Sequence, residues 1–434
     1  MAFAWASVGL LVATAALAAV VLARHLCAAG LDVSQVTRAE ILDAVLPQVK
    51  AMLLGTFLAF VIYTEGARRK VSLLAYGAVV MVFTTDMSWS KKKLPDPDAL
   101  LSVGKRSKKR IIFIRHGESK WNQAFNKSKL PHKFFMSTMT AFVNEMLVLP
   151  IFDSVLFDSP LNSEGYSQAR ILARVIETYS HPNAKERMAR EAHPALEQDM
   201  AALRGEPGSP SAIVVSSNLR RAAQTAVVAL RSRLSGRFSY RTGLGAPEQV
   251  KVLPCLQEVS RNVDTLALAP PFGEISLPGI EEHIPEETCV DLGNVLDVSD
   301  SAGNKPIFGT GLQRLEKFCT WAAERDEDMI ITAGHSLWFR HFFRTFLPRT
   351  LSEELAIQAK DLKMKNGGAV GFDLEFGQTQ DGRTIFRIDP ASISVVHGGF
   401  DVKKKKKGAL NKIKGALQKL TSGGGSGRPK EKAS

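Results

Sequence analysis

Two histidines stand directly after apolar runs that the sequence predicts as buried β-strands. The first run, 111–114, leads into Arg115-His116-Gly117, and the second, 329–333, leads into Gly334-His335-Ser336. Because ligands in open α/β sheets bind beyond the carboxyl ends of strands, we expect both imidazoles at one edge of a sheet. A histidine can act as a covalent nucleophile, and a neighbouring guanidinium can bind the oxygens of an anion. The pattern therefore indicates chemistry on an anionic group.

Two further segments have the same form of a short strand followed by polar residues. The run 211–217 leads into a helix that begins near Arg220 and Arg221, and the run 252–256 is followed by Glu258. A carboxyl group in this place could act as a general acid, or it could be a solvated loop carboxylate. The sequence thus offers an arginine and an acid as partners of the two histidines.

In this order, the four segments resemble the histidine phosphatase superfamily, whose fold is called phosphoglycerate-mutase-like. Residues 158–169 match the usual helix start of that family, and the resemblance covers roughly 110–390. It implies an α/β protein, a three-layer α/β/α sandwich with a mostly parallel central sheet. It also implies a phosphohistidine intermediate formed without a metal or a cofactor.

The resemblance assigns roles to individual residues. His116 would be the nucleophile, with Arg115, Arg221 and His335 as donors to the phosphate and Glu258 as the general acid. The family pattern Leu-x-Arg-Ala points to Arg221, which leaves Arg220 as a solvated charge at the helix start. Adjacent guanidinium charge favours the neutral imidazole that a nucleophile requires. The candidate substrate contacts are Asn122, Ser119, Ser336 and Arg261.

Departures from the family pattern favour its phosphatase branch. Mutases usually carry Tyr-Gly after the acid and His-Gly-Asn at the second histidine, where this chain has Val259-Ser260-Arg261 and Gly334-His335-Ser336. A mutase remains the first alternative, and a catalytically silent phosphate-binding scaffold on a membrane is the second. Arg261 is either a substrate contact or one half of a surface ion pair with Asp264.

Charge is concentrated at the two ends of the chain. The net charge of the 434 residues is +13, and residues 401–434 alone hold eleven Lys or Arg against two acidic residues. The region between 111 and 400 is slightly acidic, which argues against nucleic acid as a partner. The expected substrate is a phosphorylated small molecule, lipid or protein.

The amino-terminal region, 1–90, is expected to anchor the chain in a membrane. Residues 1–23 carry no charge and are long enough to cross a bilayer, and shorter uncharged runs follow at 51–64 and 71–85. A cleaved signal peptide, a re-entrant hairpin and a buried soluble hairpin remain alternatives. Eight Lys or Arg between 91 and 110 favour a cytosolic catalytic domain, whereas the basic turn 68–70 disagrees.

The remaining segments complete the expected layout. A basic linker, 91–109, precedes the phosphatase domain, 110–400, and the tail, 401–434, has a basic run before an apolar helical face that suits anionic lipid. A solvated tail or a basic address signal is the alternative there. The insert 126–157 contains an apolar stretch that is either a lid or a helix packed on the core. The spacing of the four cysteines suggests neither a disulfide framework nor a zinc site.

Overall fold

The computed structural model describes residues 38–88, 96–126, 131–179, 194–235, 248–288 and 290–401. The uncharged segment 1–23, the basic residues 91–93 and the tail from 402 onward lie outside the described residues. The predictions made for them, including the cleaved signal peptide and the lipid-binding tail, therefore stay predictions.

A mixed eight-stranded sheet forms the centre of the molecule, with the strand order β4-β3-β2-β5-β1-β6-β7 and β8 paired with β6. The strands β1 to β5 run parallel, whereas β6 is antiparallel to β1, β7 and β8. The strands are β1 (Ser107–Arg115), β2 (Ala212–Ser216), β3 (Val250–Val252), β4 (Leu296–Asp297), β5 (Met329–Gly334), β6 (Ala369–Gln378), β7 (Thr384–Ile388) and β8 (Ser394–His397). The start of β1 lies ahead of residue 110, where the sequence places the domain boundary.

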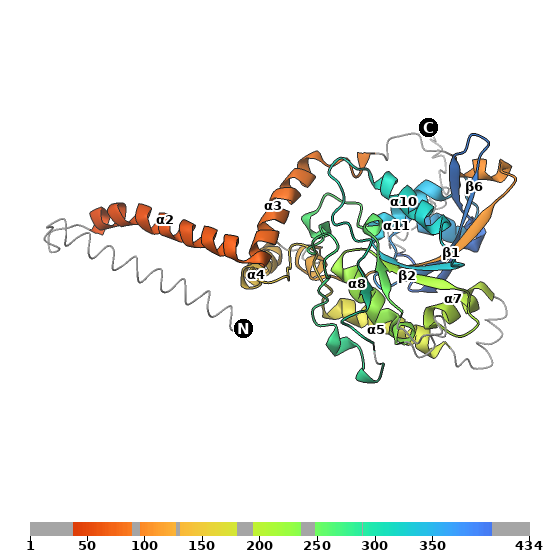
Figure 1. Cartoon of the computed structure of the whole chain (residues 1–434), viewed down its shortest axis with the longest axis horizontal. Helices are drawn as coiled ribbons and strands as arrows, with labels where there is room; N and C mark the ends of the chain where they lie inside the picture. The colour runs from red at the N-terminus through yellow and green to blue at the C-terminus, as the bar shows by residue number, and fades with distance from the viewer. Residues whose placement is uncertain are drawn as a thin grey trace, which may run out of the picture.

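Helices cover both faces of this sheet (Figure 1). The α-helices are α2 (Arg38–Tyr63), α3 (Glu65–Phe83), α4 (Pro131–Leu147), α5 (Ser163–Thr178), α7 (Pro194–Arg204), α8 (Arg220–Ala229), α9 (Arg231–Leu234), α10 (Gly311–Ala323), α11 (Ser336–Phe346) and α12 (Glu354–Asp361). The shorter helical turns are η2 (Pro97–Ser102), η3 (Asn122–Asn126), η4 (Pro254–Leu256), η5 (Val263–Thr265), η6 (Glu281–His283), η7 (Glu286–Thr288) and η8 (Pro390–Ser392). The expected α/β sheet with helices on either side is thus present.

Alternation along β1 explains how the layers hold together. Successive side chains of a strand point to opposite faces of the sheet. Ile111 and Phe113 enter one buried cluster with α10 and α11, while Ile112 and Ile114 enter the other with α5 and α8. A strand that is buried on both faces reads as a continuous apolar run, which is why 111–114 was recognisable from the sequence.

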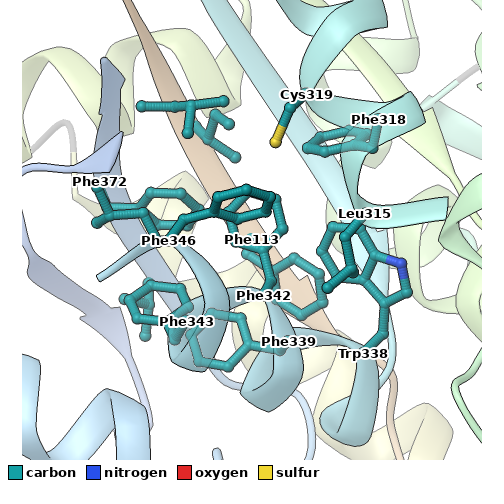
Figure 2. Close-up of a cluster of buried hydrophobic side chains, with 14 of the residues drawn as sticks. Phe113, Leu315, Phe318, Cys319, Trp338, Phe339, Phe342, Phe343, Phe346 and Phe372 are labelled. Carbon is teal, nitrogen blue, oxygen red and sulfur yellow. The ribbon is translucent and has the colours of Figure 1, made fainter. Parts of the chain in front are cut away.

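The cluster on the α11 side is rich in aromatic residues (Figure 2). Phe113 stacks on Trp338 at a centroid distance of 5.8 Å, and Trp338 stacks on Phe342 at 4.9 Å. Phe343 meets Phe372 of β6 edge to face at 4.8 Å. Such pairs add to the hydrophobic stabilisation of burial. They fix α11 firmly against the sheet, directly after His335.

The amino-terminal helices α2 and α3 meet at a bend of 101°. Within the described residues, no single helix is long and apolar enough to cross a membrane, although the bent pair Val49–Tyr63 and Glu65–Phe83 has the length and composition to do so. In Figure 1, α2 projects away from the body of the molecule, whereas α3 lies along it. The transmembrane prediction is therefore unconfirmed.

One side of α3 packs on the domain that contains the sheet. Leu73 and Val80 are buried in a cluster with Phe157, Leu266 and Leu268. Arg69 Nε donates to the Leu268 carbonyl at 2.9 Å. The region that the sequence assigned to membrane anchoring, with a buried soluble hairpin as one alternative, thus packs in part on this domain.

Candidate active site

The two predicted histidines meet because β1 and β5 are neighbours. Arg115 and Gly334 are partners in the parallel register of these strands, so His116 and His335 leave the sheet side by side. Their ring centroids are 5.1 Å apart. Both side chains are buried, at 4% and 0% exposure. The sheet edge predicted from the sequence therefore holds the paired imidazoles.

A backbone carbonyl selects the tautomer of His116. Its Nδ1 lies 2.5 Å from the carbonyl oxygen of Gly117, and a carbonyl can only accept a hydrogen bond. Nδ1 consequently carries the proton, and Nε2 keeps a free lone pair. Burial lowers the pKa of His116 well below its ordinary value of 6.5, and the charges of Arg221 and Arg115 lower it further. His116 is therefore a neutral potential nucleophile at physiological pH.

Two buried guanidinium groups flank this imidazole. Arg115 donates from Nη1 to the carbonyl of Met364, and burial lowers its pKa to about 10, so it remains charged at neutral pH. Arg221 donates from Nη1 to the backbone carbonyl of Asp264 at 2.9 Å and lies 3.5 Å from its carboxylate. Both arginines are 3% exposed. The site thus concentrates positive charge in a poorly solvated place.

His335 and Ser336 complete this group at the start of α11. His335 Nε2 lies 2.9 Å from the hydroxyl of Ser217, which follows β2. If the Ser217 hydroxyl donates to Nε2, the proton of His335 is on Nδ1. Burial lowers the pKa of His335 well below 6.5, and the charge of Arg221 adds to that effect, so the ring donates as a neutral imidazole.

Several polar atoms of these residues are buried without a partner. Among the described residues, no hydrogen-bond acceptor or donor reaches Arg115 Nε, Arg221 Nε, His335 Nδ1 or Ser336 Oγ. Leaving one such group unsatisfied costs about 1–3 kcal/mol, so a cluster of them is a feature that a bound ligand would compensate. Because the cluster is rich in donors and carries two positive charges, the ligand that it suits is an anion with several oxygens.

Glu258 lies beside this cluster, at the amino end of α11. Its Oε1 accepts from the backbone N–H of Trp338 at 2.8 Å and of Val259 at 3.1 Å, while from the described part of the chain Oε2 accepts only a longer bond of 3.3 Å from Leu337. Burial raises the pKa of Glu258 above its ordinary value, although these N–H groups and Arg221 oppose the rise. Since Oε2 is the less engaged oxygen, it is the one suited to carry a transferable proton.

A buried ion triad that the sequence did not reveal supports the loop of Glu258. Lys305 Nζ donates to the carbonyl of Glu258 at 2.8 Å and to that of Ser260 at 2.5 Å. Asp86, just after α3, accepts from Lys305 at 2.9 Å and from Arg314 at 2.6 Å. These residues stand far apart in the chain and outside any motif, so no sequence signal marks them.

Two other positioning residues also escaped the sequence analysis. Ser217 bonds His335, as described above. Thr225 of α8 accepts from the N–H of Gly117 at 3.1 Å and donates to the carbonyl of Arg221 at 2.7 Å. The second contact is an ordinary bond within a helix, yet together they link the segment after β1 to the start of α8. A hydroxyl four residues after Arg221 is the only sequence signal for it.

Two expectations about arginines are wrong. Arg220 is not a solvated charge, because it is 1% exposed and its guanidinium bonds Asp153 at 2.6 Å and the carbonyl of Asp158 at 2.8 Å. It turns to the loop before α5 and not to His116, which agrees with the choice of Arg221. The surface pair of Arg261 with Asp264 is also wrong, since Asp264 is buried against Arg221.

The remaining candidate contacts occupy different surroundings. Arg261 is exposed, next to the loop of Glu258. Ser119 is buried, and its hydroxyl accepts from the backbone N–H of Asn122 at 3.2 Å, which ties both residues to the loop after His116. Asn122 is half-buried at the start of η3. Of this group, Ser336 alone has a hydroxyl in the unpartnered cluster. Substrate binding by Ser119, Asn122 and Arg261 stays a prediction.

Of the two structures that the sequence suggested for the insert 126–157, a helix packed on the core by its apolar residues is not found, and a lid stays a prediction. The insert's helix α4 leaves most of its large apolar side chains exposed, so it is not packed on the core by them. A cavity of about 730 Å³ lies between α4 and the segment after His116, with Lys120, Gln123 and Asn162 in its wall. No group of three or more potential metal ligands occurs in the described ranges.

No protein-family model matches the chain, and no curated protein sequence matches it. Similar solved structures include a putative α-ribazole-5′-phosphate phosphatase from Escherichia coli, with 15% identity, 68% of this chain and 99% of the other covered, and a TM-score of 0.28. A mycobacterial glucosyl-3-phosphoglycerate phosphatase has 14% identity, coverages of 65% and 97% and a TM-score of 0.27. A phosphoserine phosphatase from Entamoeba histolytica has 14% identity, coverages of 68% and 98% and a TM-score of 0.25. All three are named as phosphatases, but at such TM-scores the likeness carries no argument for function.

Proposed function

We propose that this protein is a membrane-anchored phosphomonoester hydrolase that works through a phosphohistidine at His116. The observation that carries the proposal is the group of unpartnered buried donors around a histidine whose Nε2 is free. A phosphate has the charge and the number of oxygens to satisfy these donors. The resemblance seen in the sequence points to the same chemistry.

The residues would divide the reaction into two steps. In the first step, Nε2 of His116 attacks phosphorus, the bond to the leaving oxygen breaks, and Glu258 Oε2 gives that oxygen its proton. In the second step, water attacks the phosphohistidine, its proton passes to Glu258, and inorganic phosphate leaves. Arg115, Arg221 and His335 bind the equatorial oxygens, whose charge they stabilise in each transition state. Neither step uses a metal.

The membrane attachment is part of the proposal. It is supported by the uncharged run 1–23 and by the apolar helix α2, whose side chains from Leu53 to Tyr63 are largely exposed. The basic turn 68–70 no longer opposes a cytosolic catalytic domain, because Arg69 and Lys70 donate to carbonyls of that domain. Anionic lipid remains the proposed partner of the basic tail, 401–434.

The test traps the covalent intermediate on the full chain. We expect brief incubation with an aryl phosphate, followed by an alkaline quench, to leave phosphate on His116 in a mass spectrum. His116→Asn should remove both the label and the turnover, whereas His132→Asn on exposed α4 should change neither. Full activity of His116→Asn, or a label on another residue, would disprove the mechanism.

The same preparation separates the alternatives. Incubation with 3-phosphoglycerate and a bisphosphoglycerate primer should yield inorganic phosphate and little 2-phosphoglycerate. Rapid interconversion of the two phosphoglycerates would establish a mutase instead. Binding of phosphate without any labelling or turnover would establish a silent phosphate-binding protein.

A further inference from the structure

The outward face of α4 is apolar and uncovered. Phe135, Met139, Phe142, Val143 and Met146 repeat at helical spacing, and Phe135 and Phe142 are 62% and 56% exposed. A helix on the surface of a soluble protein normally turns polar residues outward. Contiguous exposed apolar residues usually mark a contact with another protein or with a membrane.

Contacts with α3 hold α4 rigidly in this orientation. Lys70 of α3 donates to the carbonyl of Val148 at 2.6 Å and lies 3.3 Å from Glu145 of α4. Glu145 also accepts from the hydroxyl of Ser154 at 2.8 Å and the N–H of Val155 at 2.8 Å. Glu145 of α4 thus faces inward, and the large apolar residues named above are left on the outside.

This face lies where α2 leaves the body of the molecule. Gly66 lies in the first turn of α3, just after α2, and packs closely against the segment that follows α4. A Cβ added at Gly66 would lie 2.5 Å from the carbonyl oxygen of Pro150 in that segment. Figure 1 shows α4 close to the junction of α2 and α3. On the outward side of α3, the exposed residues after Lys70 are uncharged as far as Phe83. Apolar surfaces of three helices therefore adjoin one junction.

We propose that α4 lies on a lipid bilayer at the point where α2 enters it, with Phe135, Met139 and Phe142 at the boundary of the acyl chains. A bilayer is favoured over a protein partner because α2 carries exposed apolar side chains on several sides, and a broad apolar solvent covers these better than one protein surface does. An apolar face of this kind binds at the headgroup–acyl boundary. The proposal rests on the proposed membrane attachment and adds a second, domain-held contact to it.

The docking has a consequence for the site. The cavity between α4 and the loop after His116 has Met136 and Leu147 in its wall together with Lys120 and Asn144. If α4 lies on the bilayer, this mixed apolar and polar cavity lies close to the lipid surface. The catalytic domain is then held against the membrane and does not hang from a free linker.

A fluorescent label on α4 tests the docking in the full chain. The chain carries Cys27→Ser and Cys289→Ser, and the remaining two cysteines, Cys255 and Cys319, are buried. Phe142→Cys and Asp381→Cys each receive an environment-sensitive nitrobenzoxadiazole label. Asp381 lies in the exposed turn after β6, which Figure 1 shows at the end of the molecule away from α2. Both proteins are reconstituted into phosphatidylcholine vesicles containing phosphatidylserine.

We expect the label at Phe142 to shift to the blue and to lose at least half of its emission when the lipids are brominated on their acyl chains. The label at Asp381 should change little. Both chains should keep their activity on a soluble aryl phosphate, because neither residue lies in the site. Retained activity with an unquenched label at Phe142 in floating vesicles would overturn the docking while leaving attachment and catalysis intact, and would point to a protein partner. Failure of the chain to float with vesicles would overturn both the attachment and the docking.

Discussion

The helices α4 and α11 both carry several aromatic residues, but those of α4 are exposed and those of α11 are buried. Each follows a segment with a site histidine, and each is rich in aromatic residues. On α11, Trp338 and Phe342 are buried against α10 and the sheet. On α4, Phe135 and Phe142 have no such cover. An apolar face therefore indicates that a helix packs against another surface. Whether the same domain provides that surface depends on the topology of the fold.

The difference reaches the site at the amino end of α11. The first N–H groups of α11 bind Glu258, and the aromatic core keeps them in place. On α4 the holding contact is near the carboxyl end, where Glu145 pairs with Lys70 of α3 at 3.3 Å. The α11 side should consequently control the chemistry and stability of the domain, while the α4 side should control where the domain sits.

The largest expected effect comes from breaking the link between α11 and catalysis. We expect Glu258→Gln to slow hydrolysis of alkyl phosphates by about 10²- to 10⁴-fold, because an amide cannot protonate the leaving oxygen. The amide oxygen can still accept from Trp338 and Val259, so the fold is retained. The loss should be smaller with aryl phosphates, whose leaving groups need little protonation. Steady-state kinetics with both substrate classes measure this difference.

The pH dependence of kcat/KM provides a second test of Glu258 as the general acid. A general acid must be protonated, and burial raises the pKa of Glu258, so kcat/KM should fall only at a pH above the usual range of a glutamate. On the acid side, the lowered pKa of His116 should keep the nucleophile neutral below pH 6.5. Glu258→Gln should abolish the alkaline fall, and Glu281→Gln in an exposed loop should preserve it. Equal losses for both substrate classes would exclude Glu258 as the acid.

The next test compares the two apolar faces directly. Phe342→Ala should lower the free energy of unfolding by about 3–5 kcal/mol, because it leaves a cavity among Phe318, Trp338 and Phe372. Phe142→Ala should change it by no more than about 0.5 kcal/mol, as is usual for exposed positions. Chemical denaturation of both variants in the same detergent, followed by circular dichroism, measures the difference. A similar loss for both would mean that α4 is buried within the protein.

The sequence could predict the residues that meet at the end of the sheet. Arg115 ends β1, the other four residues (His116, Arg221, Glu258 and His335) come after the ends of strands, and parallel strands carry such residues to one edge. The pairing of Asp264 required the structure, because its partner is Arg221 and not Arg261, which depends on how η5 folds back. Local sequence patterns predict which residues lie at the carboxyl ends of the strands. The contacts that support these residues are long-range and are not predicted by such patterns.

The amino-terminal region shows why other features could not be predicted. Hydropathy identified the apolar runs 51–64 and 71–85, but it does not separate an apolar face turned to the protein from one turned to lipid. Asp86 bonds Lys305 and Arg314, which are more than two hundred residues away. No local sequence pattern predicts that a carboxylate will form ion pairs over such a distance in the chain. The predicted boundary between the anchoring region and the domain, at residues 90–110, rests on amino-acid composition. Composition does not reveal that α3 packs on the domain.

The smallest effect is expected from a comparison of two glycines in apolar helices. One glycine packs against the domain, and the other does not. At Gly77 of α3, an added Cβ would lie 2.9 Å from Cγ1 of Val263, whereas at Gly55 of α2 it would meet nothing within 4 Å. Alanine gains up to about 1 kcal/mol of helix propensity at either site, but overpacking costs about 1–3 kcal/mol, and the β-branched valine yields poorly. We expect Gly77→Ala to lower the melting temperature of the catalytic domain by a few degrees and Gly55→Ala to leave it unchanged. Scanning calorimetry of the full chain in one detergent measures both, and an equal response would show that α3 does not depend on its contact with the loop of Asp264.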